Sequence, residues 1–280
     1  MRTNGDLSIR FAEDDDVEAL RALWQTCFDD GDAYLDLFFS RRFRPDRTLV
    51  CLIKGKPAGA AYLFPLKLTV AGRQWDYLYG YAEGVHPDFR RLGVMSALHG
   101  AIYRHCEEEG ASFVLNPSSS ETAGYFERMG MAKTVFGKRL RVSPLSKEAA
   151  GLTEIDAAEY AALRGERFCE SGYFEWDKES IAYALDENLF CDGFSYGFTL
   201  SGTPCAFVGN MSGATLRIRE LIAPAERVVE CCGLLCRCFC AESALCDLPE
   251  TVPFPGERVL TGMTYGRRPP TGAYFNLYWD

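Results

Sequence analysis

Long apolar runs and an excess of positive charge are both missing from this sequence. No stretch of its 280 residues approaches the roughly 20 consecutive apolar residues that a transmembrane helix needs. Lys and Arg number 30 against 39 Asp and Glu, so the net charge is −9. Nucleic acids and anionic lipids repel such a chain, and we therefore expect neither a nucleic acid nor a membrane among its partners.

A secretory signal is missing too, because residues 1–6 are polar and contain no apolar segment. We therefore interpret the 12 cysteines as reduced thiols of a cytoplasmic protein. Several of them crowd residues 231–240, but no Cys-x-x-Cys pair is present, and side chains from one helix do not easily surround a metal ion. Cys232, Cys236 and Cys240 instead fit an apolar stripe of a helix, and we expect no metal.

What the chain has is ample material for a core, since 48% of its residues are hydrophobic and 25% are charged. Its length suits one large domain or two ordinary ones. In the first half, an acidic helix start at 13–16 precedes apolar residues at helical spacing, Leu20, Leu23 and Trp24. Periodicity there predicts strands over 7–11, 48–53, 58–70, 75–85 and 112–115, and, after the helix that begins at 13–16, further helices over about 33–42, 93–109 and 121–129.

The second half repeats this order faintly. Helices are predicted over 152–163, 178–185 and 225–242, strands over 214–222 and 274–280, and a Gly-x-Pro turn at 202–204 echoes the one at 55–57. Residues 261–263 echo 129–131 ahead of a final strand region. A duplicated architecture with a boundary within 143–151 explains these echoes, whereas coincidence is the alternative because such turns are common.

The segment from Gly84 to Met95 is the most informative in the chain. A strand ends at Val85, a proline turn follows, and an arginine-rich loop leads directly into a helix. Free amides at a helix start bind anions, Gly93 allows close backbone approach, and Arg90 and Arg91 add donors for phosphate oxygens. Two arginines at the positive end of a helix dipole are unfavourable unless an anion lies there, so the pattern predicts a pyrophosphate site.

This segment resembles the signature of the GNAT family of acyl-CoA-dependent N-acyltransferases. The family pattern is Val-x-Pro followed by Arg/Gln-x-x-Gly-x-Gly/Ala, and here Val85-His86-Pro87 precedes Arg-Arg-Leu-Gly-Val-Met at 90–95. Met95 departs from the small residue of the pattern. The resemblance extends across about residues 7–142, and the two-half layout resembles tandem GNAT proteins whose second copy has lost catalysis.

The resemblance implies an α+β fold with two tandem GNAT-like domains, each a twisted mixed sheet flanked by helices. Residues 1–145 would be the acyl-CoA-binding domain, and residues 146–280 a degenerate copy that supports the first or shapes the acceptor cleft. Acetyl-CoA would be the acyl donor, with pantetheine between the strands at 77–85 and 112–115. The residues implied to bind it are Val85, Arg90, Arg91, Leu92, Gly93, Val94, Met95 and Ser119.

Acyl transfer to an amine requires removal of a proton from the ammonium form, and a carboxylate can do this. Glu83 is the candidate base, and strict strand alternation would place it on one face with Tyr77, Tyr79 and Tyr81 unless a bulge intervenes. The alternative is an acid paired with an arginine. The family's proton-donating tyrosine corresponds to Phe126, so the resemblance leaves the adjacent Tyr125, or solvent, as the donor; packing on a helix face is the alternative for Tyr125. Ser119 stands where the family has asparagine.

We therefore expect an N-acetyltransferase that acts on a primary amine of a small molecule or a peptide N-terminus. A non-catalytic acyl-CoA-binding or regulatory protein is the alternative, favoured by Met95 and Phe126. Aminoacyl transfer from tRNA is disfavoured by the net charge of −9. The sequence leaves the oligomeric state open.

Overall fold

The computed structural model describes residues 7–144, 148–170 and 172–277. The chain forms two compact units. Unit 1 comprises Met1–Leu66, Asp76–Ala132 and Met263–Arg267, and unit 2 comprises Lys67–Trp75, Lys133–Gly262 and Arg268–Asp280. Both units combine helices with sheet, which confirms the α+β class. Among the described residues, no helix has the length and apolar character needed to cross a membrane.

The strands of unit 1 lie in the order β1 (Leu7–Phe11), β2 (Thr48–Ile53), β3 (Lys56–Val70), β4 (Arg73–Val85) and β5 (Ser112–Leu115), followed by the end of β12 (Glu257–Tyr265). The β1–β2 and β2–β3 pairs are antiparallel, whereas β4 and β5 are parallel. The central strands read as nearly continuous apolar runs because helices cover both of their faces.

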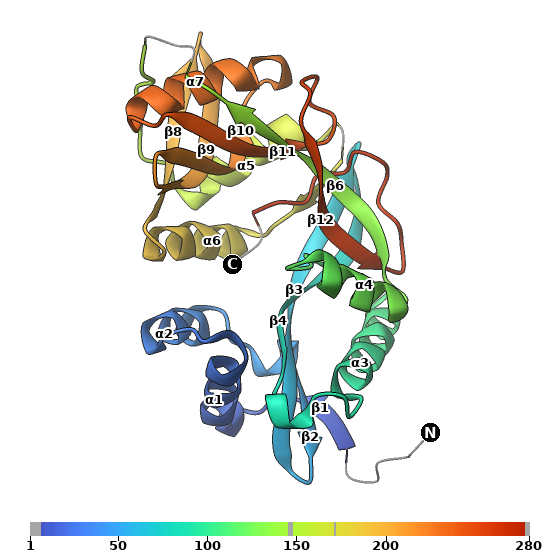
Figure 1. The fold of residues 1–280 in the computed structure, drawn as a ribbon. Coiled ribbons are helices and arrows are strands. Elements are labelled where there is room, and N and C mark those ends of the chain that lie inside the picture. The colour runs from blue at the N-terminus through green and yellow to red at the C-terminus, as the bar shows by residue number, and fades with distance from the viewer. Residues whose placement is uncertain (1–6, 145–147, 171, 278–280) are drawn as a thin grey trace. The chain divides into compact units, whose positions relative to one another are not determined.

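Helices α1 (Val17–Phe28) and α2 (Asp32–Arg41) cover one face of this sheet, and α3 (Val94–Glu109) and α4 (Ser120–Arg128) cover the other (Figure 1). The acidic segment predicted to start a helix forms a capping box between Glu13 and Asp16 immediately before α1. On the α1 side, Trp24 packs against Phe38, Tyr62 and Tyr81, with ring centroids 4.6 to 5.8 Å apart.

The sheet of unit 2 continues from the first part of β12 through β6 (Ala132–Val142), β11 (Ser243–Pro249), β10 (Thr215–Ile222), β9 (Thr203–Ser212) and β8 (Gly193–Leu200). A short strand, β7 (Tyr173–Glu175), pairs with the end of β3. Helix α7 (Val228–Cys238) packs on one face, and α5 (Ala157–Phe168) and α6 (Lys178–Phe190) pack on the other.

Cysteines on α7 fill the apolar core beneath that helix. Cys231, Cys232 and Cys236 are buried in one cluster with leucines of β10 and α7. None of the 12 cysteines forms a disulfide bond, and the part of the chain that the structure describes holds no group of three or more potential metal ligands. The predicted stripe does not extend to Cys240, which is exposed and lies beyond the end of α7 with a φ of 51°.

Apart from β7, which lies between α5 and α6, the order of elements in unit 2 repeats that of unit 1, because α5-α6-β8-β9-β10-α7-β11 corresponds to α1-α2-β2-β3-β4-α3-β5. The echo at 261–263 is wrong, however, since these residues lie inside β12, whereas 129–131 form the turn before β6. Residues 274–277 form no strand apart from one bridge at Tyr274, and 278–280 lie outside the described residues. The domain limit at 145 stays a prediction.

Candidate active site

The two central strands of unit 1 separate at a bulge in β4. Backbone pairing with β5 ends at Tyr79 and Val114, while β4 continues to Val85. Ala82 has a φ of 45°, which is a left-handed conformation that breaks the regular alternation of side chains. The bulge overturns the expectation that Glu83 shares a face with the strand tyrosines. A Cβ built on Gly80 would lie 2.5 Å from Glu83 Oε1, so Glu83 faces α3.

Tyr81 points to the opposite face, where its hydroxyl lies 2.6 Å from that of Tyr34 on α2. Its ring packs at 6.1 Å from Tyr79. At Tyr81, the aromatic face predicted from the strand pattern packs against α1 and α2. The carboxylate of Glu83 belongs to a different environment.

A cavity of about 690 Å³ opens where β4 ends. Its lining comes from four places: the end of α1, the end of β4, the loop and first turn before and within α3, and one side of α4. The lining residues are Cys27, Phe28, Glu83, Gly84, Val85, Phe89, Arg90, Arg91, Gly93, Val94, Met95, Ser96, Thr122 and Tyr125. The cavity thus collects most of the residues singled out from the sequence.

The N-terminus of α3 forms one wall of this cavity. Arg91 and Gly93 have φ values of 64° and 84°, and this geometry turns the chain sharply into the helix. The first backbone hydrogen bond of the helix runs from the Ala97 amide to the Gly93 carbonyl, so the amides of Val94, Met95 and Ser96 precede the helical ladder. Arg90 and Arg91 line the same end of the cavity, and amides and guanidinium groups in this arrangement can bind an anion; we call this end of the cavity the anion cradle.

Glu83 forms a buried pair with a histidine on α3. Its Oε2 lies 2.6 Å from Nε2 of His99, and the side chains are only 6% and 1% exposed. The other carboxylate oxygen, Oε1, is buried and has no hydrogen-bond partner among the described residues. An unsatisfied buried acceptor costs about 1–3 kcal/mol, which favours a proton or a water at this oxygen during function.

The far side of the His99 ring contacts a tyrosine one helical turn later. Nδ1 lies 3.0 Å from the hydroxyl of Tyr103, which also lies 3.2 Å from the Met129 carbonyl oxygen and donates to it. The Tyr103 ring stacks on Tyr265 with centroids 3.6 Å apart. Burial raises the pKa of Tyr103, and the nearby Glu83 charge raises it further, so this phenol stays protonated at neutral pH.

The Tyr103 hydroxyl can therefore donate to the Met129 carbonyl oxygen or to His99 Nδ1, depending on whether Nδ1 carries a proton. When it donates to the Met129 carbonyl, His99 Nδ1 must carry a proton and donate to it; when it donates to Nδ1, that nitrogen is free of a proton. Rotation of one hydroxyl accommodates both a protonated and a deprotonated pair. The arrangement suits a group that gains and loses a proton.

On α4, two neighbouring aromatic residues have different surroundings. Tyr125 is 37% exposed and lines the cavity, with the Arg128 guanidinium 5.7 Å from its ring. Phe126 is buried and packs on His99, with ring centroids 5.2 Å apart. The helix thus presents a phenol to the cavity at 125 and supports the Glu83–His99 pair at 126.

Two of the residues implied to bind the acyl donor lie away from the cavity lining. Leu92 is 47% exposed. Ser119 caps α4, since its Oγ accepts the Thr122 amide at 3.1 Å, and Thr122 rather than Ser119 lines the cavity. Their roles in binding stay predictions.

From the sequence alone, no role was assigned to His99, Cys27, Phe28, Tyr103 or Thr122. A signal for His99 was present, because it lies among Leu98, Ile102 and Cys106 on the buried face of α3. A polar side chain on an apolar helix face requires a partner. For Cys27 and Phe28, no local pattern distinguishes the end of α1 from any other helix end.

Residues 8–133 match the model of a family described as an acetyltransferase (GNAT) domain. No curated protein matched the chain significantly. Among solved structures, the fold resembles a conserved protein from Enterococcus faecalis V583 described as a probable N-acyltransferase (TM-score 0.74, 11% identity, covering 92% of this chain and 72% of that one).

The fold also resembles a GCN5-related N-acetyltransferase from Anabaena variabilis (TM-score 0.72, 14% identity, covering 92% of this chain and 72% of that one). A further similar structure is N-myristoyltransferase from Saccharomyces cerevisiae with bound myristoyl-CoA (TM-score 0.55, 12% identity, covering 96% and 85%). These likenesses establish a shared fold.

Proposed function

We propose that the segment matching the GNAT acetyltransferase model, residues 8–133, is a GNAT domain, and that the protein transfers an acetyl group from acetyl-CoA to a primary amine. One observation carries the proposal. The cavity at the N-terminus of α3 contains both an anion cradle and a buried carboxylate with a free oxygen. In this proposal, the donor site and the base share one cavity.

The cradle suits the pyrophosphate of the donor. The backbone amides of the first turn of α3 lie at the helix end that lines the cavity. Arg90 and Arg91 line the same end and can supply charge-assisted donors. Nothing lies within 4 Å of a Cβ built on Gly93, so the backbone there is open to close approach. Met95 lines the cavity without closing it, which reconciles this departure from the family pattern with donor binding.

Glu83 is the proposed base. An alkylammonium acceptor has a pKa of about 10 and must lose a proton before its nitrogen lone pair can attack the thioester carbon. Glu83 Oε1 accepts that proton directly or through a water, while Oε2 stays bonded to His99. Tyr103, bonded to Nδ1 of His99, holds the imidazole that in turn positions the carboxylate.

Attack forms the amide C–N bond and breaks the C–S bond, and the CoA thiolate leaves needing a proton. Tyr125 is the proposed donor because its phenol lines the same cavity on α4. Thr122 and solvent reach the cavity from the same side. Phe126, which stands at the family's tyrosine position, instead packs on His99 and holds the base in place.

Unit 2 is proposed to be a degenerate copy. Pro224 and a short 3-10 helix at Ala225–Arg227 precede α7 in place of an arginine- and glycine-containing loop. The interface between β10 and α7 is an apolar cluster that includes Leu216, Ile218 and Leu221. We therefore assign donor binding to unit 1.

The proposal is tested by mixing the protein with acetyl-CoA and a panel of small amines and N-terminal peptides while following free thiol release. We expect acceptor-dependent release that saturates in both substrates. Myristoyl-CoA and butyryl-CoA, offered as competing donors, measure the acyl-chain preference. Saturable acetyl-CoA binding without turnover on any acceptor would support the alternative, a non-catalytic acyl-CoA-binding protein.

Replacement of Gly93 tests where the donor binds. Gly93→Trp places an indole at the helix start, and we expect acetyl-CoA affinity to fall at least tenfold in calorimetric titration. The matched control is Gly110→Trp at the other end of α3. Both glycines have a positive φ and no atom within 4 Å of a built Cβ, so both substitutions carry the same backbone strain. Equal affinity in the two variants contradicts the donor site.

A further inference from the structure

Unit 2 contains a second cavity on the face of its sheet opposite α7. It has a volume of about 280 Å³, and polar side chains on four adjacent strands and the C-terminal segment line it. These include Arg139, Asn210, Arg217, Arg219, Asp247 and Asn276. The cavity plays no part in the proposed acetyl transfer.

Strand geometry explains why these side chains gather. Leu216 and Ile218 point into the apolar cluster under α7, so Arg217 between them points to the other face. Arg217 lies opposite Asn210 of β9, and Arg139 of β6 lies opposite Asp247 of β11. Cross-strand neighbours on one face of a sheet lie within reach of long side chains.

A bulge adds a further arginine to this face. The register of β10 shifts between Ile218 and Glu220, and Leu221 returns to the cluster under α7. Because two residues then separate the inward-facing positions, Arg219 and Glu220 both turn away from α7. A strictly alternating strand would have placed only one of them there.

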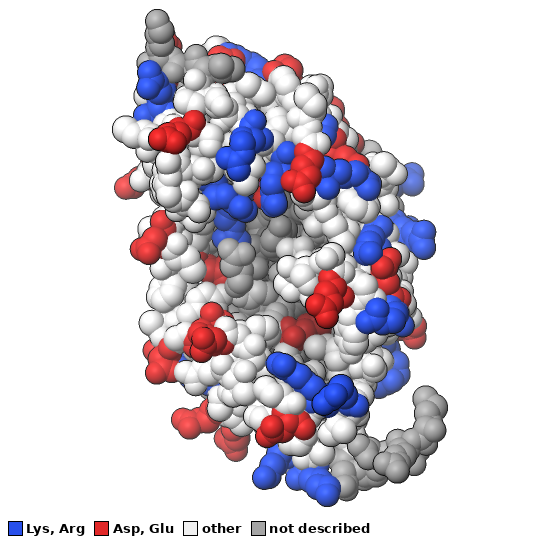
Figure 2. All heavy atoms as spheres, viewed as in Figure 1, with Lys and Arg blue, Asp and Glu red and all other residues white. Residues whose placement is uncertain are grey.

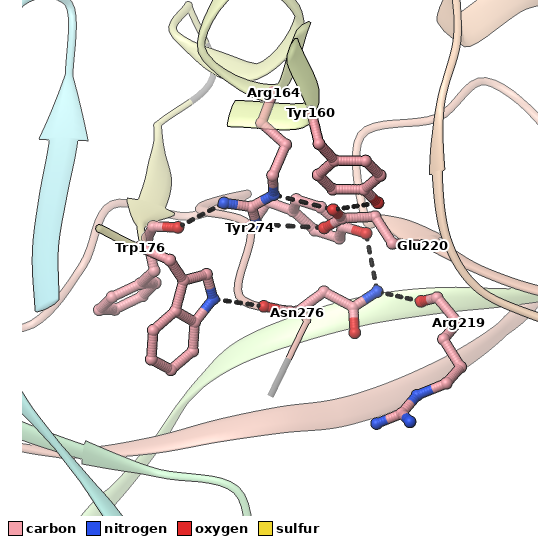
Figure 3. Close-up of polar contacts among 8 residues, drawn as sticks. Tyr160, Arg164, Trp176, Arg219, Glu220, Tyr274 and Asn276 are labelled. Carbon is pink, nitrogen blue, oxygen red and sulfur yellow. Dashed lines mark hydrogen bonds and ion pairs between the residues drawn. The ribbon is translucent and has the colours of Figure 1, made fainter. Parts of the chain in front are cut away.

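A buried network fixes the backbone at this bulge (Figure 3). The Glu220 carboxylate is held by Arg164 at 2.8 and 3.1 Å and by the Tyr160 hydroxyl at 2.9 Å. The side-chain amide of Asn276 donates to the Arg219 carbonyl oxygen and, at 2.8 Å, to the Tyr274 hydroxyl. Figure 3 shows the Arg219 guanidinium extending away from the Glu220 carboxylate, toward the other side of this network.

The charge lining the cavity is strongly positive for a chain with a net charge of −9. Three arginines line it with one aspartate, and that aspartate is held by Arg139 through two contacts of 2.6 and 2.9 Å. Figure 2 shows Lys and Arg side chains gathering over β6, β10 and β11. Like charges on one face repel, and a bound anion relieves the repulsion.

We propose that this cavity binds a small, multiply charged oxyanion, either a phosphate group or a dicarboxylate carried by a small molecule. Planar guanidinium groups match the oxygen geometry of both, and the Asn210 side-chain amide can supply a further donor. The arginines and Asn210 stand on strands, and Asn276 is held by its hydrogen bonds to the Arg219 carbonyl and the Tyr274 hydroxyl, so the site is formed before the ligand arrives.

Calorimetric titration tests the proposal, with inorganic phosphate and malonate added separately at constant ionic strength. The protein is first saturated with CoA so that the cradle of α3 is filled; if CoA fails to bind, Gly93→Trp takes the place of the saturated protein. We expect saturable binding of at least one anion, and the tighter of the two identifies the ligand class. Absence of saturable binding for both anions overturns the proposal.

Substitutions of the lining residues test whether the anion binds in this cavity. Arg217→Gln with Arg219→Gln should weaken anion binding at least tenfold, whereas the same change at the exposed Arg268 should leave it unchanged. Ser212→Asp, at an exposed position on the cavity rim, adds a negative charge without touching the core and should cause a similar loss. Wild-type affinity in the double variant and in Ser212→Asp would place any bound anion elsewhere.

Discussion

Glu83→Gln is expected to lower kcat by roughly a hundred- to ten-thousand-fold, the range that general base catalysis contributes. The substitution keeps the size and the hydrogen bond to His99, but the amide accepts no proton. The KM for acetyl-CoA should change little, since the cradle at α3 is separate from this side chain. Steady-state thiol release with a saturating amine measures both constants.

The loss should be greatest well below the acceptor's own pKa of about 10, where nearly all of the amine is charged. Above that pH the free amine is supplied by solution, and the variant should approach the wild type. Glu108→Gln, an exposed glutamate on the same helix as His99, is the matched control. A uniform loss at every pH would assign Glu83 a structural role.

Tyr103→Phe tests whether the Tyr103 hydroxyl supports the base Glu83 through His99. The ring that stacks on Tyr265 is retained, so folding should be preserved, but the hydroxyl that bonds His99 is lost. We expect a smaller fall in kcat than for Glu83→Gln, together with a shifted pH profile. An unchanged pH profile would show that the hydroxyl does not help to set the proton affinity of the pair.

Arg164→Met is expected to destabilise the protein by about 3–5 kcal/mol, the cost of leaving one member of a buried ion pair without its partner. Arg164 and Glu220 are both buried, with side chains 1% and 0% exposed. Burial, the largest single influence, lowers the pKa of Arg164, but the Glu220 carboxylate together with the Tyr160 and Tyr274 phenols raises this pKa above its usual value. Methionine fills a similar volume, so the loss reflects charge rather than a cavity. Urea denaturation measures it.

The double variant Arg164→Met with Glu220→Gln distinguishes lost pairing from lost packing. Glutamine still accepts the Tyr160 hydroxyl but carries no charge, so most of the lost stability should return. A double variant as unstable as Arg164→Met would show that the carboxylate was not the source of the loss. Replacement of Arg227, whose pair with Glu230 lies on the surface, should leave the stability close to that of the wild type.

Much of unit 1 follows from local patterns. The predicted strands at 7–11, 48–53 and 112–115 match β1, β2 and β5, and the acidic start and Gly110 bound α1 and α3 as expected. These elements are regular, so periodicity and capping define them. Prediction was poorer in unit 2, where α5 begins at Ala157 rather than 152 and α7 ends at Cys238 rather than 242.

By itself, the sequence predicted the regular elements of unit 1 and the turn, glycine and helix start at the N-terminus of α3, because these features are contiguous in the chain and their geometry is local. Tertiary structure alone decided the surroundings of Glu83. The left-handed backbone at Ala82 turned that carboxylate from the aromatic face to His99, and a bulge in β10 sent Arg219 and Glu220 to one side. A single extra residue in a strand reverses which face a side chain occupies, and only the pairing with distant strands reveals it.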